Sequence, residues 1–187
     1  MEVGFDDFTK AGFARLLKHF ETNTDDVVKL TKAFALANRA HRGKFMDEPH
    51  INHSLRVALI LADEFQVRDA ELVSAAFLHD ALESVPESDV KEECGDNIAS
   101  IVRAAADPKP AEAGPEEYYA KLAKESKEAR LVKLAEKLDI ARAMKNHAYR
   151  ERALRFKDEA QKHTIPLAQK TDERFAFKLS VALYEIK

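Results

Sequence analysis

The chain has 187 residues, of which 45% are hydrophobic and 34% charged, and its net charge at pH 7 is −3. This composition predicts a globular protein in which residues 1–187 form a single domain with a full hydrophobic core. The only cysteine, Cys94, excludes an internal disulfide framework and predicts a reducing, cytoplasmic location.

Membranes and nucleic acids are both disfavoured as partners. No apolar run approaches the ~18 residues that a membrane-spanning helix needs, and residues 1–8 lack the basic and apolar regions of a signal peptide. The pI is near 6.2, tryptophan is missing, and no basic patch is interleaved with aromatic residues. The sequence leaves open whether the chain forms a homo-oligomer.

Apolar residues recur at helical spacing almost throughout the chain, and the strict alternation that is typical of strands is lacking. The sequence therefore predicts an all-α fold. Helices are expected over residues 5–20, 27–42, 52–65, 69–82, 88–93, 97–106, 116–124, 127–148, 150–163 and 171–186.

The breaks between these helices carry recognisable signals. Asn23 opens an N-cap sequence, and Gly43 closes the second helix. Pro49 and Pro86 indicate a loop and the end of the central helix, and Pro166 predicts a break near residue 164. The loop at residues 108–115 is not expected to be a domain boundary, because neither flank shows a complete core pattern of its own.

One short stretch of the central helix combines polar groups with apolar flanks. His79 and Asp80 are neighbours, Glu83 follows four residues after His79, and residues 75–77 and 81–82 are apolar. Burying such groups is costly unless they are paired or bind a metal. Imidazole and carboxylate ligands suit Mn, Fe, Zn or a similar divalent ion, and a glutamate on the same helical face can orient or deprotonate a water. From spacing alone, a structural role for the pair is an equal alternative.

A metal site needs further ligands from distant segments. His53 is a candidate because it begins a helix beside a loop, and Glu136 is a candidate because it interrupts an apolar helical pattern. The alternative interpretation is that Glu136 is a salt-bridged surface residue, because Lys133 lies three residues before it. His41 and His50 flank the same loop as His53 and could support the ligands or contact an anion.

Charge is distributed unevenly along the chain. Residues 61–120 hold 15 Asp and Glu against 4 Lys and Arg, whereas residues 121–157 hold 12 Lys and Arg against 5 Asp and Glu. Solvated helix faces explain such runs in most proteins. The alternative is a basic wall that attracts a small anionic substrate.

Four stretches, in this order and rough spacing, resemble the HD-domain (p)ppGpp hydrolases, which comprise the hydrolase half of the RelA/SpoT proteins and their small single-domain relatives. The resemblance covers roughly residues 25–145. The stretches are Ala40-His41-Arg42-Gly43, Glu48-Pro49-His50-Ile51-Asn52-His53, Phe77-Leu78-His79-Asp80-Ala81-Leu82-Glu83 and Val132-Lys133-Leu134-Ala135-Glu136-Lys137-Leu138.

The resemblance implies an HD-domain helical bundle and a metal-dependent hydrolase of the stringent response. It implies one divalent metal, Mn²⁺, with His53, His79, Asp80 and Glu136 as ligands, and Glu83 as the catalytic acid that positions water. The substrate would be (p)ppGpp or a related small nucleotide, from which pyrophosphate is released at the 3′ position.

The chain also departs from the family pattern. Ser84 stands where the family has a second acid after the glutamate, Glu136 replaces an aspartate, and His50 replaces a tyrosine. These differences keep an alternative open, in which a catalytically degenerate HD protein binds a nucleotide or a protein partner. The basic residues expected to meet phosphates are Arg42, Lys44, Lys137 and Arg142.

Overall fold

The structure is a computed structural model that describes residues 5–44, 48–107, 114–145 and 150–187. Within these ranges the protein is helical and contains no β-strand, which confirms the predicted all-α class. The chain divides into two compact units, Met1–Ala106 and Asp107–Lys187. The single domain predicted for residues 1–187 stays a prediction. No helix of the described ranges is long and apolar enough to cross a membrane.

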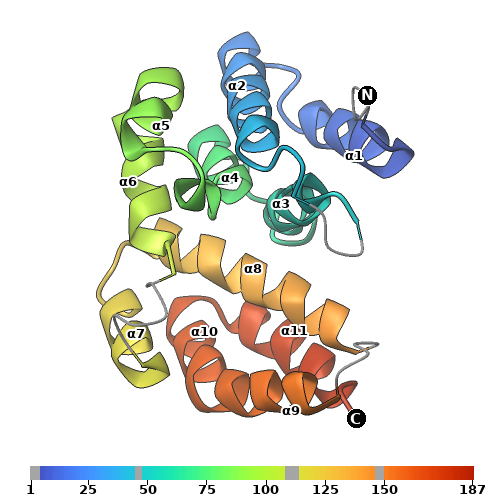
Figure 1. Ribbon diagram of the computed structural model, residues 1–187, viewed down its shortest axis with the longest axis vertical. Coiled ribbons are helices and arrows are strands. Elements are labelled where there is room, and N and C mark those ends of the chain that lie inside the picture. The colour runs from blue at the N-terminus through green and yellow to red at the C-terminus, as the bar shows by residue number, and fades with distance from the viewer. Residues whose placement is uncertain (1–4, 45–47, 108–113, 146–149) are drawn as a thin grey trace. The chain divides into compact units, whose positions relative to one another are not determined.

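The first unit is a group of helices packed around α4 (Figure 1). A π-helical turn, η1, continues α3, and a 3₁₀ turn, η2, follows α4. The elements of this unit are α1 (Asp7–Lys18), α2 (Thr24–Ala40), α3 (His50–Leu59), η1 (Ile60–Glu64), α4 (Ala70–Phe77), η2 (Ala81–Glu83), α5 (Glu87–Cys94) and α6 (Asp96–Ala105).

The helix α4 forms the centre of this unit because nearly all of its residues are apolar and buried. It packs against α2, α3 and α6. Its last residue, Phe77, lies edge-on to Phe34 and Phe13, with ring centroids 5.5 and 6.0 Å away. Asp69 caps the other end by accepting hydrogen bonds from the amides of Glu71 and Leu72. The C-terminal end of α4 is thereby held in the core.

The structure confirms the predicted signals at two other breaks. Asn23 caps α2 through hydrogen bonds from the amides of Asp25 and Asp26. Gly43 lies in the left-handed region at φ +75°, within a turn closed by the Lys44 amide and the His41 carbonyl at 2.9 Å. This turn follows the end of α2 directly.

The predicted central helix over residues 69–82 is wrong at its C-terminal end, because α4 stops at Phe77. In a continued α-helix the Ala76 carbonyl would accept the amide of residue 80. Instead it faces Nδ1 of His79 at 2.9 Å, so the imidazole takes over that acceptor. His79 and Asp80 therefore lie in a turn, and the expected helical face shared by His79 and Glu83 does not exist.

The helix predicted from Asn52 begins earlier, at His50, with Pro49 as its N-cap. Proline suits the start of a helix because it has no amide hydrogen to leave unbonded. This shift brings His50 into the first turn of α3 together with His53.

The second unit is built on α8, which packs against α10 and α11. The predicted break near Pro166 is wrong: η3 runs directly into α10, and Pro166 occupies the first turn of α10, where its missing amide hydrogen costs nothing. The helical path is instead interrupted at Asp172, which caps α11. The elements are α7 (Pro115–Leu122), α8 (Lys127–Met144), α9 (Arg150–Glu159), η3 (Ala160–Thr164), α10 (Ile165–Thr171) and α11 (Glu173–Tyr184).

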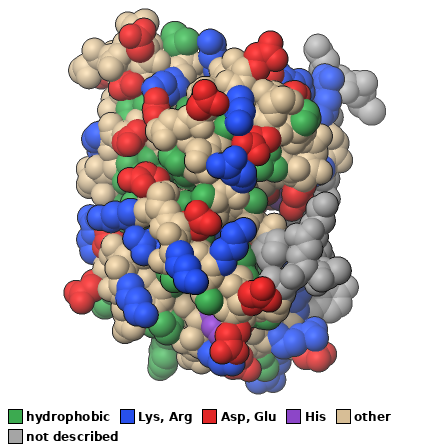
Figure 2. Space-filling view, turned by 90° about the vertical axis from the view of Figure 1, so that its left-hand side faces the viewer, with side chains coloured by type: hydrophobic (Ala, Val, Ile, Leu, Met, Phe, Trp, Pro, Cys, Tyr) green, Lys and Arg blue, Asp and Glu red, His purple; other side chains and the backbone are tan. Residues whose placement is uncertain are grey.

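The face seen in Figure 2 carries Lys and Arg side chains interspersed with Asp and Glu. Within the acidic stretch, Glu87 pairs with Lys91 at 3.5 Å and with Arg103 at 3.1 Å, and both cations are about half exposed. These pairs fit the interpretation of solvated helix faces. The basic wall of the alternative interpretation stays a prediction.

Candidate metal centre

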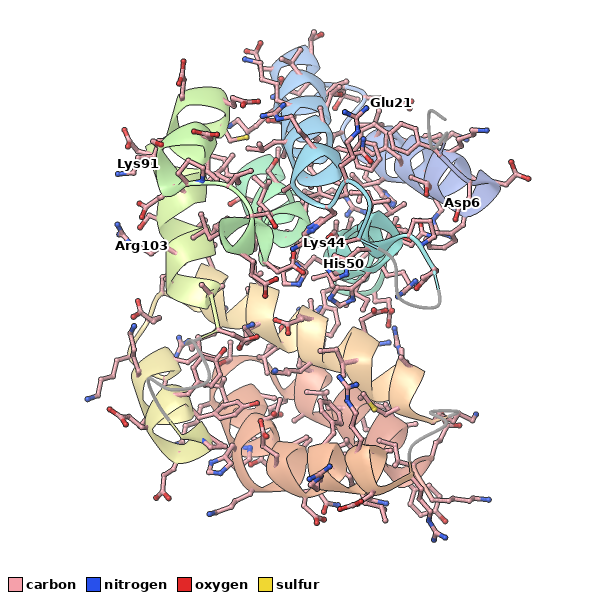
Figure 3. All side chains as sticks on the ribbon, viewed as in Figure 1. Asp6, Glu21, Lys44, His50, Lys91 and Arg103 are labelled. Carbon is pink, nitrogen blue, oxygen red and sulfur yellow. The ribbon has the colours of Figure 1, made fainter. Side chains whose placement is uncertain are left out.

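Four histidines and an aspartate gather where three helices of the first unit end or begin. His41 follows the last residue of α2, His50 and His53 lie in the first turns of α3, and His79 and Asp80 follow α4. Figure 3 shows His50 beside Lys44, the residue that closes the turn after α2. Segments far apart in the sequence thus supply one cluster of side chains.

His53 and His79 face each other through their ring nitrogens. Their Nε2 atoms lie 3.2 Å apart, and His79 is 3% exposed. A carbonyl oxygen can only accept a hydrogen bond, so Nδ1 of His79 carries the hydrogen that it donates to Ala76. In the neutral ring this leaves the lone pair on Nε2, directed at His53. Two nitrogens at this distance need a proton or a cation between them.

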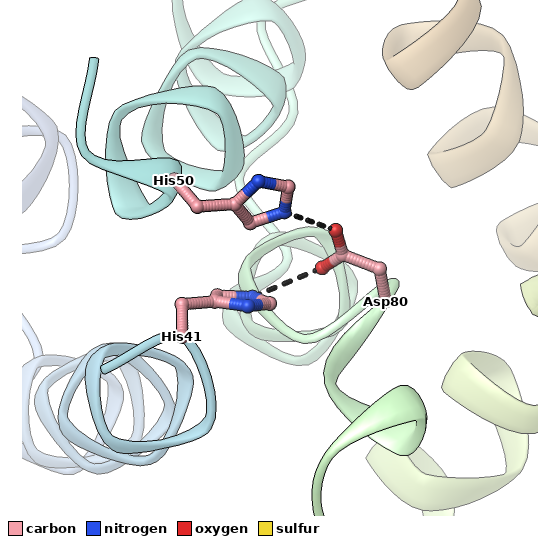
Figure 4. A group of neighbouring side chains, drawn as sticks. All are labelled: His41, His50 and Asp80. Atoms are coloured by element: carbon pink, nitrogen blue, oxygen red, sulfur yellow. Dashed lines mark hydrogen bonds and ion pairs between the residues drawn. The ribbon is translucent and has the colours of Figure 1, made fainter. Parts of the chain in front are cut away.

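Asp80 completes this first group and belongs to a second one. Its Oδ2 lies 3.7 Å from Nε2 of His79. It also lies 2.6 Å from Nε2 of His50, and Oδ1 lies 3.0 Å from Nε2 of His41 (Figure 4). Burial raises the pKa of the Asp80 carboxyl, but the adjacent His79 and the contacts of His41 and His50 outweigh burial and hold that pKa well below its ordinary value. The carboxylate therefore stays ionised.

Both groups bring possible metal-ligand atoms close together. The ligand atoms of His53, His79 and Asp80 all lie within 4.8 Å of one another, and so do those of His41, His50 and Asp80. An ion bound at 2.0–2.2 Å sets its neighbouring ligand atoms about 3 to 3.5 Å apart. The separations of 3.2 and 3.7 Å in the first group are close to this range. In the second group the 3.0 Å between His41 and Asp80 fits it, whereas the 2.6 Å between His50 and Asp80 is a hydrogen-bond distance. The Ala76 carbonyl behind His79 matches the outer partner that metal-binding imidazoles usually have.

Glu83 and Lys44 form an exposed pair in the same unit. The side chain of Glu83, in η2, is 69% exposed, and its Oε2 lies 3.5 Å from Nζ of Lys44, which is 39% exposed. Arg42 is also exposed, two residues before Lys44. Lys44, Arg42 and Glu83 are thus free of the core and available to a ligand in solution.

The other predicted site residues lie in the second unit, on α8. Glu136 is 4% exposed and forms an ion pair with the buried Lys133, which also contacts Asp107 at 3.1 Å. Nζ of Lys137 lies 3.7 Å from Glu136. Burial disfavours the ammonium of Lys137, but Glu136 outweighs that effect and raises its pKa. Arg142 is exposed. The salt bridge expected as the alternative for Glu136 is present, but the expected surface position is wrong because Glu136 is buried. Its role as a metal ligand stays a prediction.

The sequence did not indicate that His41 and His50 both meet Asp80. Their position beside one loop was visible, but the partner was not, because Asp80 was expected on a helix. A histidine in each segment that flanks the loop was the only available signal.

An all-α unit that brings imidazole and carboxylate groups together at its helix ends defines a class of helical proteins with a His/Asp metal centre. The chain belongs to the HD-domain family, whose family model, described as "HD domain", matches residues 33–172. The family implies a divalent metal ion, with which the two His/Asp groups are compatible.

Relatives and a solved structure point to one branch of that family. The chain is 35% identical over 113 residues to guanosine-3′,5′-bis(diphosphate) 3′-pyrophosphohydrolase MESH1 of Drosophila melanogaster, over 58% of this chain and 63% of that one. It is 32% identical over 124 residues to MESH1 of Danio rerio, and this alignment covers 62% of this chain and 69% of the relative. It is 35% identical over 82 residues to the bifunctional (p)ppGpp synthase/hydrolase SpoT of Escherichia coli strain K12, and this alignment covers 42% of this chain and 11% of SpoT.

The structural likeness extends further along the chain than these alignments. A solved structure, described as a metazoan orthologue of SpoT that hydrolyses ppGpp, superposes with a TM-score of 0.77 at 25% identity. It covers 84% of this chain and 94% of that one. The sequence alignments, by contrast, span 63% of the fly protein and 11% of the Escherichia coli protein.

Proposed function

We propose that the protein is a metal-dependent phosphohydrolase that releases pyrophosphate from the 3′ position of (p)ppGpp or a related nucleotide. The observation that supports this proposal most directly is that the Nε2 atoms of His53 and His79 face each other beside Asp80. It occurs in a member of the HD-domain family whose relatives carry the name of this pyrophosphohydrolase. A cytoplasmic location and a part in the stringent response belong to the same proposal.

The residues proposed to hold the metal, Mn²⁺, are His53, His79, Asp80 and Glu136. A bound divalent ion would polarise a phosphoryl oxygen and lower the pKa of water. His79 is kept in the tautomer that presents Nε2, because Nδ1 donates to the Ala76 carbonyl. The fourth ligand, Glu136, rests on the resemblance alone.

Glu83 is the group proposed to act on the attacking water. Its exposed carboxylate can accept a proton from water as the oxygen attacks the phosphorus and the bond to the 3′ oxygen breaks. The departing 3′ oxygen takes up a proton from solvent and becomes a hydroxyl. The cations proposed to bind the phosphates of the nucleotide supply charge-assisted hydrogen bonds. They are Lys44, Arg42, Lys137 and Arg142.

Pyrophosphate release from a nucleotide panel tests the proposal. The full chain, loaded with Mn²⁺, is assayed with ppGpp, nucleoside triphosphates and nucleoside monophosphates. We expect the wild type to turn over ppGpp and Asp80→Ala to be inactive. Asp7→Ala, which alters an exposed aspartate on α1, should keep the wild-type activity. Equal rates for the wild type and Asp80→Ala would contradict the proposal.

Ser84 supports the alternative of a degenerate protein, because the family has a second acid at this position. That alternative predicts nucleotide binding in calorimetry without release of pyrophosphate. Metal-dependent turnover would exclude it.

A further inference from the structure

We propose that His41, His50 and Asp80 hold a second divalent transition-metal ion beside the first, with the Asp80 carboxylate shared between the two. The inference rests on the proposed function only in that His53, His79 and Asp80 hold the first ion. The two groups of possible ligands have Asp80 in common and otherwise consist of different histidines.

The buried imidazole of His41 is the main evidence for a second cation. It is 3% exposed, and neither of its ring nitrogens has a partner with hydrogen-bond geometry in the described part of the chain. Its Nε2 nevertheless lies 3.0 Å from Oδ1 of Asp80. A buried polar group without a hydrogen bond costs free energy, and coordination of a metal ion would remove that cost.

His50 supplies the second imidazole of the group. Its Nε2 lies 2.6 Å from Asp80 Oδ2, and the rings of His41 and His50 lie 4.4 Å apart between centroids. Figure 4 shows both rings directed at the same carboxylate, one from the end of α2 and one from the start of α3. His50 reaches this position because α3 begins at His50, after Pro49.

Asp80 can serve two ions because it has two oxygens and stands between two pairs of histidines. Oδ1 faces His41, and Oδ2 lies between His50 and His79. Two imidazoles and a carboxylate favour Mn²⁺, Fe²⁺ or Zn²⁺ over Mg²⁺ or Ca²⁺. A second ion at this place would add positive charge beside the reacting phosphate, as in two-metal phosphoryl-transfer sites.

The competing explanation is that His41 and His50 only hold Asp80 in place by hydrogen bonds. Two variants separate ligation from orientation. His50→Tyr keeps an aromatic ring and a hydroxyl that can bond Asp80 but removes the imidazole ligand. His41→Gln keeps an amide donor that can reach Asp80 but is a poor ligand for a transition metal.

The test is the metal content of the full chain after dialysis against Mn²⁺, measured by elemental analysis. We expect about two ions per chain in the wild type and about one in His50→Tyr and in His41→Gln. The control, His19→Gln, alters a histidine that contacts another aspartate, Asp63, at 2.5 Å, and it should retain both ions. Electron paramagnetic resonance adds a second readout, because two Mn²⁺ ions on one carboxylate couple magnetically and a single ion does not.

The outcomes distinguish this inference from the proposed function. One ion in the wild type that persists in both variants would overturn the second site and leave the first standing. One ion that is lost in His50→Tyr and kept in His53→Gln would overturn the two-ion arrangement, because the metal would then occupy the second group alone. An absence of bound metal in the wild type would overturn both proposals.

Discussion

At the scale of single residues, Lys44 is proposed to bind phosphate and Glu83 to accept a proton from water. Glu83 is too exposed to be held by the core, and its contact with Lys44 at 3.5 Å is a weak surface pair. Lys44 can therefore exchange this contact for one with a ligand at little cost. A phosphate that displaces Glu83 from Lys44 would also leave the carboxylate ready to accept a proton.

Lys44→Ala is expected to weaken substrate binding more than it slows the reaction. Loss of a charge-assisted hydrogen bond to an exposed phosphate costs about 1.5 kcal/mol, which is about a tenfold rise in KM with a smaller change in kcat. Steady-state kinetics with ppGpp measure both constants. The matched control is Lys91→Ala, because Lys91 is similarly exposed and also lies 3.5 Å from a glutamate. An unchanged KM would show that Lys44 does not bind the phosphates.

At the scale of elements, a buried polar network ties α1 to the start of α3. Oγ1 of Thr9 and Oδ1 of Asn52 are 2.5 Å apart, and Nδ2 of Asn52 donates to Asp6 at 2.7 Å. Thr9 is 1% exposed and Asn52 is 2% exposed. Since His53 follows Asn52 directly, the same network fixes the turn of helix that carries a proposed ligand.

Asn52→Leu should destabilise the protein by about 1–3 kcal/mol, because Thr9 and Asp6 lose their buried partner while the branched shape of the side chain is kept. Urea denaturation followed by circular dichroism measures the free energy of unfolding. The control is Gln169→Leu, an exposed glutamine of α10, which should change it by less than about 0.5 kcal/mol. Equal effects of the two substitutions would show that the network adds no stability.

The same network predicts a pH dependence. The pKa of Asp6 is lowered, first by the hydrogen bond from Asn52 and then by those from the amide and hydroxyl of Thr9. A carboxyl with a lowered pKa in the folded state stabilises the protein above its unfolded pKa of about 3.9. This stabilisation is lost as the pH falls through the lower, folded-state pKa. The stability advantage of the wild type over Asp6→Asn should therefore be present at pH 6 and shrink below about pH 4. A difference that is constant with pH would contradict this assignment.

Helix positions followed from apolar spacing because burial alone dictates that pattern, and the core around Phe77 was predictable in this way. The end of α4 was not, because it depends on a bond between the His79 side chain and the Ala76 carbonyl that no periodicity records. Nor was the continuous path through Pro166, because a π-helical turn can lead into a new first turn. Of the candidate site, the predicted ligands His53, His79 and Asp80 lie together, and their role as ligands stays a prediction. The contacts of His41 and His50 with Asp80 needed three-dimensional information.

At the scale of the whole molecule, the centre of the first unit combines aromatic packing with a cluster of possible metal ligands. The Phe13 and Phe34 rings stack at 4.1 Å, and Phe77 packs against both of them immediately before the His79–Asp80 turn. Such packing holds a polar cluster that, without a cation, is unfavourable in the interior. Metal binding should therefore stabilise the fold as well as serve the reaction.

We expect removal of divalent metal by a chelator to lower the Tm of the full chain, and Mn²⁺ to restore it. An ion present at a hundred times its Kd adds about 2.7 kcal/mol to the stability of the folded state, which raises Tm by several degrees for a chain of this size. Differential scanning calorimetry with and without Mn²⁺ measures the shift. Asp80→Ala should abolish the shift, whereas Asp7→Ala should retain it, because Asp7 is fully exposed on α1. A shift of equal size in Asp80→Ala would place the stabilising ion outside the cluster of histidines and Asp80.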